Sequence, residues 1–210
     1  MAKFTPLKQG ERRVTTTFRL HPNDQSHRLE GLSIRGLLAR RTGTLEVTFN
    51  FQGSLDRIRW PPVLSDCSRR GGLWQHTCCE LFFSPKGRDH YWELNVSPCG
   101  GWNIYRFSGY RSGMQEEGEV SCPSCVVFKD DVSGLFTLSC SFETGSIIDD
   151  AVGLELGVSC VVEEENGRLG YWAMSHPGAK PDFHDRKSFT ALLGSIDRIF
   201  SGTPGSDVQA

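Results

Sequence analysis

The stretch DHYWELNVSPCGGWNIYRFSGYRSGM, residues 89–114, contains two strand-like runs joined by a turn. The runs are Tyr91–Ser97 and Trp102–Phe107, and the Pro-Cys-Gly-Gly segment between them is rich in turn-forming residues. Aromatic rings lie here beside amide, carboxylate and guanidinium groups, which is the mixture that a small polar ligand with apolar faces needs. The stretch therefore predicts a strand–turn–strand unit that carries part of a binding site.

The first run separates into two faces, because successive side chains of a strand point to opposite sides of the sheet. Trp92, Leu94 and Val96 occupy one set of alternate positions, and we expect them in the core. Tyr91, Glu93 and Asn95 occupy the other set. We expect the ligand on this second face.

The same alternation of apolar and polar residues recurs along the chain, in TLEVTFNFQG (44–53), LFTLSCSFE (135–143) and LELGVSCVV (154–162). Further strands are expected at Val14–Leu20, Leu29–Ala39, His76–Ser84, Cys125–Phe128 and Gly170–His176. The single helix-like candidate, Phe189–Phe200, could equally begin as the final strand. Many short strands separated by Gly and Pro turns predict an antiparallel β-sandwich. We expect one domain over residues 1–200 and a disordered tail over 201–210.

Composition narrows the class of partner. The net charge of −2 and the isoelectric point near 6.3 give no basic footprint for nucleic acid or an anionic membrane. No apolar stretch approaches the roughly 20 residues of a membrane span. The N-terminus lacks the apolar region of a secretory signal, so a cytoplasmic location is expected. In that setting we expect most of the eight cysteines to be reduced thiols in the core.

A second polar face is predicted in LWQHTCCELFF, residues 73–83. In a strand, His76 and Glu80 point away from the apolar side of this run, and the short PKGRD connection predicts a hairpin with Tyr91–Ser97. Glu80 and Asn95 should then share one polar face. The alternative is an outer face that is simply solvated.

Aromatic and cationic side chains surround this face in the sequence. Trp74 precedes the strand expected at His76–Ser84. Trp102 follows the Gly-Gly turn, where it could stack on a sugar ring or cover the core. Tyr105 and Arg106 belong to the same run as Trp102. Arg106 and Arg111 could bind a polar ligand or pair with Glu93 or Glu116.

The segment HPGAKPDFH, residues 176–184, supplies further candidates for the rim of a site. Two prolines stiffen a loop that carries His176, Lys180, Asp182 and His184. Histidine and aspartate are metal-ligand types, but their spacing matches no strong metal signature. We expect no bound metal.

Catalytic motifs give weak signals. Glu80 and Glu93 could face each other as a glycosidase carboxyl pair. The Cys122-Pro-Ser-Cys125 motif is followed by a Val-Val-Phe strand and not by the helix of a redox site. No GxSxG, HExxH or P-loop sequence occurs.

The runs LWQHTCCELFF, YWELNVSPCGGWNIYRFSGYRSGM and WAMSHPGAKPDFHDRKSF together resemble the bacterial DOMON-like domains, roughly from Leu73 to Phe189. This group is related to the family-nine carbohydrate-binding modules and to the haem-binding DOMON domains. The resemblance implies a β-sandwich of the jelly-roll type that binds its ligand on one sheet face under loops. Trp102, Glu80 and Asn95 are then the residues that could hold a sugar.

The haem-binding relatives ligate iron with a methionine and a histidine. The residues of these types are Met114, Met174, His76, His90, His176 and His184, and none lies in a distinctive ligand motif. We therefore expect a non-catalytic domain that binds a carbohydrate or similar polar small molecule, with no cofactor. The alternatives are a haem- or metal-binding domain in electron transfer and a glycoside hydrolase that uses Glu80 and Glu93. The sequence does not indicate an oligomeric state.

Overall fold

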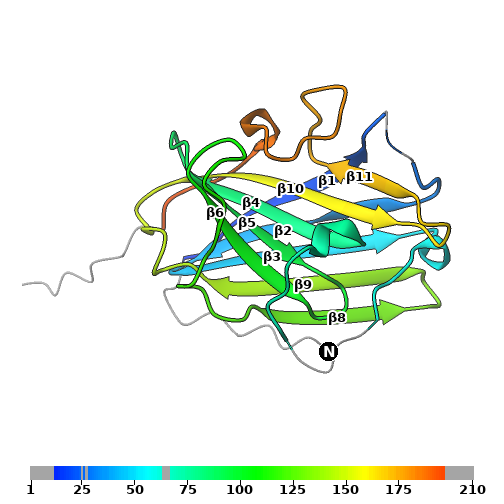
Figure 1. Ribbon diagram of the computed structural model, residues 1–210. Coiled ribbons are helices and arrows are strands. Elements are labelled where there is room, and N and C mark those ends of the chain that lie inside the picture. Colours follow the sequence, from blue (N-terminus) through cyan, green and yellow to red (C-terminus); the bar gives the residue numbers. More distant parts are fainter. Residues whose placement is uncertain (1–11, 25, 27, 63–66, 197–210) are drawn as a thin grey trace, which may run out of the picture.

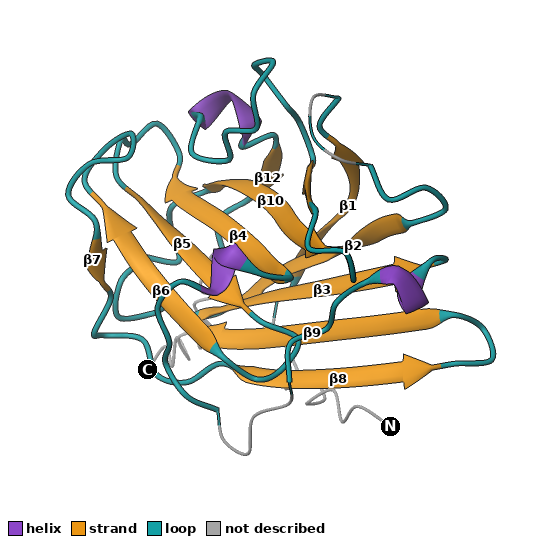
Figure 2. Ribbon diagram, turned by 45° about the vertical axis from the view of Figure 1, so that its right-hand side comes forward, coloured by secondary structure: helices purple, strands orange, loops and turns teal. Residues whose placement is uncertain are grey.

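The structure is a computed structural model that describes residues 12–24, 26, 28–62 and 67–196. Its strands pair antiparallel and form two layers, so the expected antiparallel β-sandwich is confirmed (Figures 1 and 2). The tail expected over residues 201–210 lies outside the described residues.

One layer contains, in spatial order, β1 (Val14–Pro22), β2 (Ser33–Arg41), β3 (Thr44–Gln52), β9 (Leu135–Glu143) and β8 (Ser124–Asp130). The other contains β11 (Leu169–Ala173), β10 (Leu154–Glu163), β4 (Cys78–Pro85), β5 (Tyr91–Val96), β6 (Trp102–Phe107) and β7 (Gln115–Glu116). A short strand, β12 (Ala191–Leu193), pairs with the beginning of β10.

Strand β1 joins the two layers. Most of β1 pairs with β2, but His21 and Pro22 at its end pair with β11 of the other layer. The layers are therefore one hydrogen-bonded sheet that folds over on itself, with β7 and β8 as its free edges. Many neighbouring strands are distant in sequence, since β3 pairs with β9 and β4 pairs with β10.

Helical structure is limited, among the described residues, to three one-turn 3-10 helices: η1 (Leu55–Arg57), η2 (Leu73–Gln75) and η3 (Arg186–Ser188). No helix in the described part of the chain has the length and apolar character to cross a membrane. Of the two interpretations of the segment from Phe189, the strand is correct, because Ala191–Leu193 is β12. Residues 197–200 of that candidate lie outside the described part.

The core lies between the layers and follows the alternation of the sequence. In β5, Trp92, Leu94 and Val96 face this core, as expected. Phe83 and Trp92 stack with ring centroids 5.7 Å apart, and Phe83 also contacts Phe142 of the other layer. Burial of these large rings contributes to the stability of the sandwich.

The β4–β5–β6 layer is also buried on its outer face. A second apolar cluster there contains Phe82, Tyr91, Tyr105, Phe107 and Phe189. The segment that joins β11 to β12, shown in orange in Figure 1, covers this face. The strands β4 and β5 therefore have almost no exposed residue, and polar groups on their outer face are enclosed.

The cysteines include one disulfide. Cys67 and Cys122 are bonded across a sequence separation of 55 residues. The other six cysteines are free thiols, so the expectation that most of the eight are reduced is met. Cys122 is bonded to Cys67 and not to Cys125, so the Cys-Pro-Ser-Cys motif does not close as a redox pair.

Candidate functional site

Three neighbouring strands place two carboxyl groups on the outer face of the β4–β5–β6 layer. Glu80 of β4 lies opposite Asn95 of β5 and opposite Ser159 of β10. Glu93 lies two positions from Asn95 on the same face and opposite Phe82 of β4. The expected hairpin and the shared face of Glu80 and Asn95 are therefore both present.

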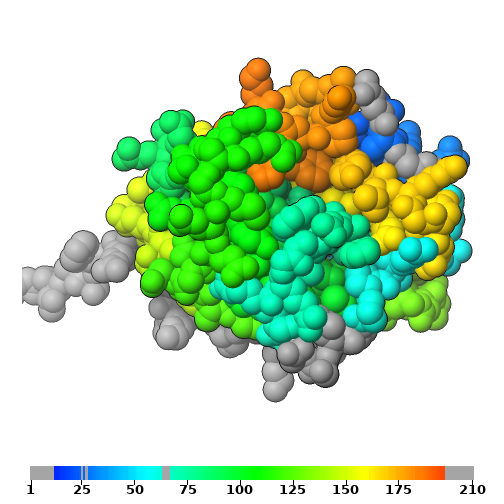
Figure 3. Space-filling view, in the orientation of Figure 1, coloured from blue at the N-terminus to red at the C-terminus, as the bar shows by residue number. Residues whose placement is uncertain are grey.

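A cavity of about 330 Å³ opens above these strands. Its volume is at the lower end of the range of small-molecule sites. The strands contribute Glu80, Phe82, Glu93, Phe107, Val161 and Tyr171. Three covering segments, which are η2, the loop after β6 and the segment that joins β11 to β12, contribute Trp74, Arg111, Met114, Pro181, Phe183 and His184. Figure 3 shows the segments that carry Trp74 (teal), Arg111 (green) and His184 (orange) meeting on one face of the molecule.

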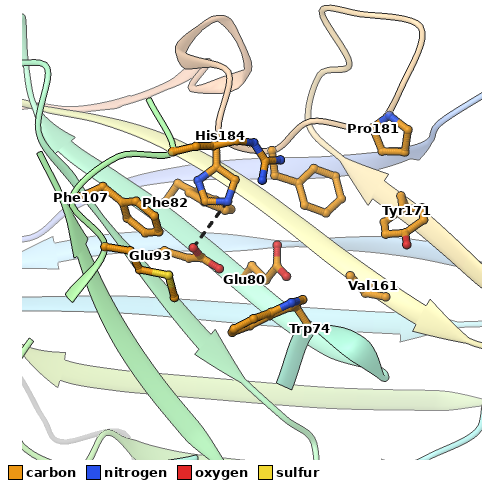
Figure 4. Close-up of a pocket in the computed structure, with 12 residues that line it drawn as sticks. Trp74, Glu80, Phe82, Glu93, Phe107, Val161, Tyr171, Pro181 and His184 are labelled. Atoms are coloured by element: carbon orange, nitrogen blue, oxygen red, sulfur yellow. Dashed lines mark ion pairs between the residues drawn. The ribbon is translucent and has the colours of Figure 1, made fainter. Parts of the chain in front are cut away.

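Each carboxyl group is almost fully buried and has one hydrogen bond. Glu80 is 3% exposed, and its Oε2 accepts a hydrogen bond from the Ser159 hydroxyl at 2.8 Å. Glu93 is 5% exposed, and its Oε1 accepts one from Asn95 Nδ2 at 2.7 Å. In the described part of the chain, no hydrogen bond reaches the second oxygen of either group. Figure 4 shows both carboxyl groups in the cavity between Trp74 and His184.

Burial raises the pKa of both carboxyl groups, because the charged form loses its hydration. The pKa of Glu80 rises to about 8, through burial first and the neighbouring Glu93 second. Burial raises the pKa of Glu93 to about 7, against the Asn95 hydrogen bond and the positive charge of Arg111, which both lower it. The site therefore holds protons at neutral pH.

His184 lies next to Glu93 and belongs to the segment that joins β11 to β12. Its Nδ1 lies 2.8 Å from the Tyr91 hydroxyl oxygen, which accepts the backbone N–H of Arg111 at 3.3 Å. The phenol hydrogen is then free to donate to Nδ1, which assigns the imidazole proton to Nε2. That atom faces Glu93 Oε2 at 3.8 Å (Figure 4). Burial and then Arg111 lower the pKa of His184 to about 4, so the ring is neutral at pH 7.

Arg111 and Asp182 fasten the two covering segments together. Arg111 donates to Asp182 Oδ1 from Nη2 at 2.8 Å and from Nε at 3.3 Å. Arg111 also has a positive φ of 49°, which is uncommon for a residue with a side chain. Strained backbone of this kind clusters at ligand sites, where surrounding contacts hold it.

Trp74 provides an aromatic surface at the mouth of the cavity. It lies on η2, which begins after Gly72 in the left-handed conformation (φ 73°) that glycine adopts readily. The ring meets Tyr105 edge-to-face at 5.9 Å and is 37% exposed. Its free surface is available for stacking.

Comparisons with known proteins give one informative likeness. No protein-family model matches the sequence, and no curated protein matches it. A candidate carbohydrate-binding protein of known structure from Bacteroides uniformis superposes with a TM-score of 0.55 and 13% identity over 84% of each chain. The two proteins share a fold. A family 9 carbohydrate-binding module from Caldicellulosiruptor kristjanssonii, solved with cellotriose, gives a TM-score of 0.38 and 9% identity over 75% of this chain and 72% of its own.

Four of the expected ligand-binding residues line the cavity: Trp74, Glu80, Glu93 and His184. Three others support them from outside the lining. Asn95 donates to Glu93, Tyr105 contacts the Trp74 ring, and Asp182 pairs with Arg111. Sequence positions that are far apart thus meet at one place.

Trp102 is the main correction. It lies opposite Val96 on the core side of the layer, is 4% exposed, and has the Arg69 guanidinium 4.3 Å from its ring centroid. Its ring cannot reach a ligand on the outer face, and of its two interpretations the core position is correct. Trp74 has the exposed ring at the cavity instead.

Four further candidates lie away from the cavity lining. His76 Nδ1 lies 2.7 Å from Glu163 Oε2, and His176 Nε2 lies 2.8 Å from the backbone oxygen of His21. Arg106 and Lys180 are exposed. Arg106 shares the strand parity of Trp102, so it points away from the outer face.

Sequence reasoning missed several lining residues. Phe82 and Val161 share the outward parity of Glu80 and Ser159, so the alternation could have found them. The sequence suggested that Arg111 binds a polar ligand or pairs with Glu93 or Glu116. Its ion-pair partner in the structure is Asp182. The other missed residues are Phe107 at the end of β6, Tyr171 in β11, and Met114, Pro181 and Phe183 on the covering segments.

The described residues offer few side chains that could ligate a metal ion or a haem iron. The described residues contain no group of three or more His, Cys, Asp or Glu side chains that could hold a metal ion. Met114 and His184 do line the same cavity. Nevertheless, both ring nitrogens of His184 are directed at protein groups, Nδ1 at Tyr91 and Nε2 at Glu93. Iron ligation would have to displace one of them.

Proposed function

We propose that this chain is a ligand-binding β-sandwich whose cavity holds a carbohydrate or a polar molecule of similar size, without catalysing its conversion. The observation that carries the proposal is the pairing of an exposed aromatic ring with enclosed hydrogen-bonding groups. Trp74 offers a stacking face, and Glu80 and Glu93 each present an unused carboxyl oxygen beside it. Sugar rings have apolar faces and hydroxyl edges that match this pairing.

The likeness to the Bacteroides uniformis protein supports this choice among polar ligands, because that protein is described as carbohydrate-binding. A glycoside hydrolase needs one carboxyl group ionised while its partner is protonated. Burial raises the pKa of Glu93 to about 7 and that of Glu80 to about 8, so a hydrolase that uses this pair is the second candidate function. Release of reducing sugar from a glycoside by the wild type, lost in Glu80→Gln, would favour hydrolysis over binding alone.

Titration calorimetry with a panel of mono- and disaccharides at millimolar concentration tests the proposal. One stacking contact and a few hydrogen bonds predict dissociation constants on the order of micromolar to millimolar. Trp74→Ala should weaken binding at least tenfold while the protein stays folded. The matched control is Phe128→Ala, because Phe128 is an exposed aromatic residue on β8 of the other layer. Absence of binding by every sugar to folded wild-type protein refutes the proposal.

A further inference from the structure

On the basis of this binding function, we propose that the ligand carries a primary ammonium group that is held between Glu80 and Glu93, so that the site selects an amino sugar or a similar polar amine over its neutral counterpart. The fold likeness does not indicate a charge on the ligand. The inference comes from three features of the cavity: its unused oxygens, the lack of a charged cation in contact with its described carboxyl groups, and its aromatic walls.

The unused oxygens are arranged for a donor with several hydrogens. Glu80 Oε1 and Glu93 Oε2 belong to carboxyl groups that are more than nine-tenths buried and that line the same cavity. Neither oxygen has a hydrogen bond within the described residues. An ammonium group has three N–H donors and no acceptor, so one such group has enough donors for both oxygens.

The two carboxyl groups have no charged cation in contact with them. In the described part of the chain, the only basic nitrogen within 4 Å of either group is His184 Nε2, at 3.8 Å from Glu93. That ring is neutral at pH 7. The positive charge of Arg111 lowers the pKa of both groups, but its ion-pair partner is Asp182. Without a contacting cation the buried groups hold protons, whereas a cation from the ligand allows them to ionise.

The other described neighbours of the two carboxyl groups are neutral. They are the Cys78 thiol and the Ser159 hydroxyl beside Glu80, and the Asn95 amide and the His184 ring beside Glu93. Burial raises the pKa of Cys78 well above its usual value, so this thiol is protonated. The protein therefore provides acceptors without a counter-ion.

The walls suit a cation as well. Aromatic rings of Trp74, Phe82, Phe107, Tyr171 and Phe183 line the cavity. The faces of such rings carry negative electrostatic potential and attract an ammonium group, most strongly where water is excluded. An N-acetylated amine lacks both the charge and two of the three hydrogens, so acetylation should abolish the preference.

Ammonium binding must also release protons. Glu80 and Glu93, whose pKa values are about 8 and about 7 in the free protein, ionise when a cation is placed between them. A neutral sugar does not require this ionisation. Proton release thus distinguishes the two kinds of ligand in the wild-type protein, without any substitution.

The experiment is titration calorimetry at pH 7 with three matched series: glucose, galactose and mannose, their 2-amino forms and their N-acetylated forms. We expect each bound amino sugar to exceed its neutral and acetylated counterparts at least tenfold in affinity. Repetition in phosphate and in HEPES, which differ in ionisation enthalpy, should show proton release for the amines alone.

Glu80→Gln combined with Glu93→Gln keeps the size of both side chains and removes their charge. This variant should bind amino and neutral sugars within about twofold of each other, with a wild-type circular dichroism spectrum as the check on folding. The matched control is Glu165→Gln, since Glu165 is exposed and does not line the cavity.

The outcomes separate the two proposals. Equal affinity for neutral and amino sugars, or amine binding without proton release, overturns the ammonium site and leaves carbohydrate binding standing. A preference for amines that survives in the double variant also overturns it. If no sugar of any series binds, the proposed function fails and the ammonium site fails with it.

Discussion

Replacing both Glu80 and Glu93 by glutamine should change how stability depends on pH. The pKa values of about 8 and about 7 in the folded protein lie above the value of 4.5 that an exposed glutamate has. Between pH 4.5 and 8 the folded state therefore binds more protons than the unfolded chain, and the free energy of unfolding falls as the pH rises. The stabilising contribution is complete below pH 4.5 and is lost by pH 8.

The size of the effect follows from the two shifts. One pKa unit corresponds to about 1.4 kcal/mol, so the two groups together account for at most roughly 8 kcal/mol. The slope approaches roughly 2.7 kcal/mol per pH unit near pH 6, where both groups are protonated in the folded protein and ionised in the unfolded chain. His184 acts in the opposite sense between pH 4 and 6.5, because its pKa is lowered to about 4. This contribution is common to the wild type and the variant, so it cancels when they are compared.

The assay is urea unfolding monitored by tryptophan fluorescence at pH 5, 6, 7 and 8. Glutamine retains an oxygen for the hydrogen bonds from Ser159 and Asn95, so the variant should match the wild type near pH 5. At pH 8 the variant should be more stable by several kcal/mol. Glu165→Gln serves as the control and should follow the wild type. Parallel curves for wild type and double variant from pH 5 to 8 would refute the assignment of buried, protonated carboxyl groups.

Other substitutions probe the remaining parts of the fold and site. Trp102→Ala should lower the free energy of unfolding by about 3–5 kcal/mol, whereas Trp74→Ala should lower it far less, as urea unfolding will show. Cys67→Ser opens a loop of 55 residues and should lower stability by about 4 kcal/mol under non-reducing conditions. Arg111→Gln removes a positive charge that lowers the pKa of His184, so an NMR titration should find that pKa raised. An unchanged value contradicts the placement of this arginine.

Strand alternation made part of the site predictable. In β5, apolar and polar side chains alternate without interruption, so the sequence alone places Leu94 in the core and Glu93 on the outer face. The short connection from β4 then determines the hairpin register that brings Glu80 opposite Asn95. Local rules suffice here because a hairpin is a local structure.

The rest of the site depends on contacts between distant segments. Trp74 lies on a 3-10 helix, where the alternation of a strand does not predict which way a side chain points. The face of the sheet on which Trp102 lies depends on the register of β6 against β5, which the Gly-Gly turn does not determine. His184 is held at the cavity by contacts between distant segments, which include its hydrogen bond with Tyr91 and the Arg111–Asp182 ion pair. The pairing of Cys67 with Cys122 likewise cannot be derived from spacing, because eight cysteines permit many pairings.

The order of the strands has a consequence for how fast the chain folds. β3 pairs with β9 and β4 pairs with β10, so Thr48 meets Ser139 across 91 residues and Cys79 meets Cys160 across 81. Contacts of such high sequence separation must close large loops before any pairing energy is gained, which puts two-state folding of β-sandwiches in the range of milliseconds to seconds. A disulfide between Cys67 and Cys122 that is already closed in the unfolded chain shortens the path from β3 to β9, so oxidised protein should refold faster than reduced protein.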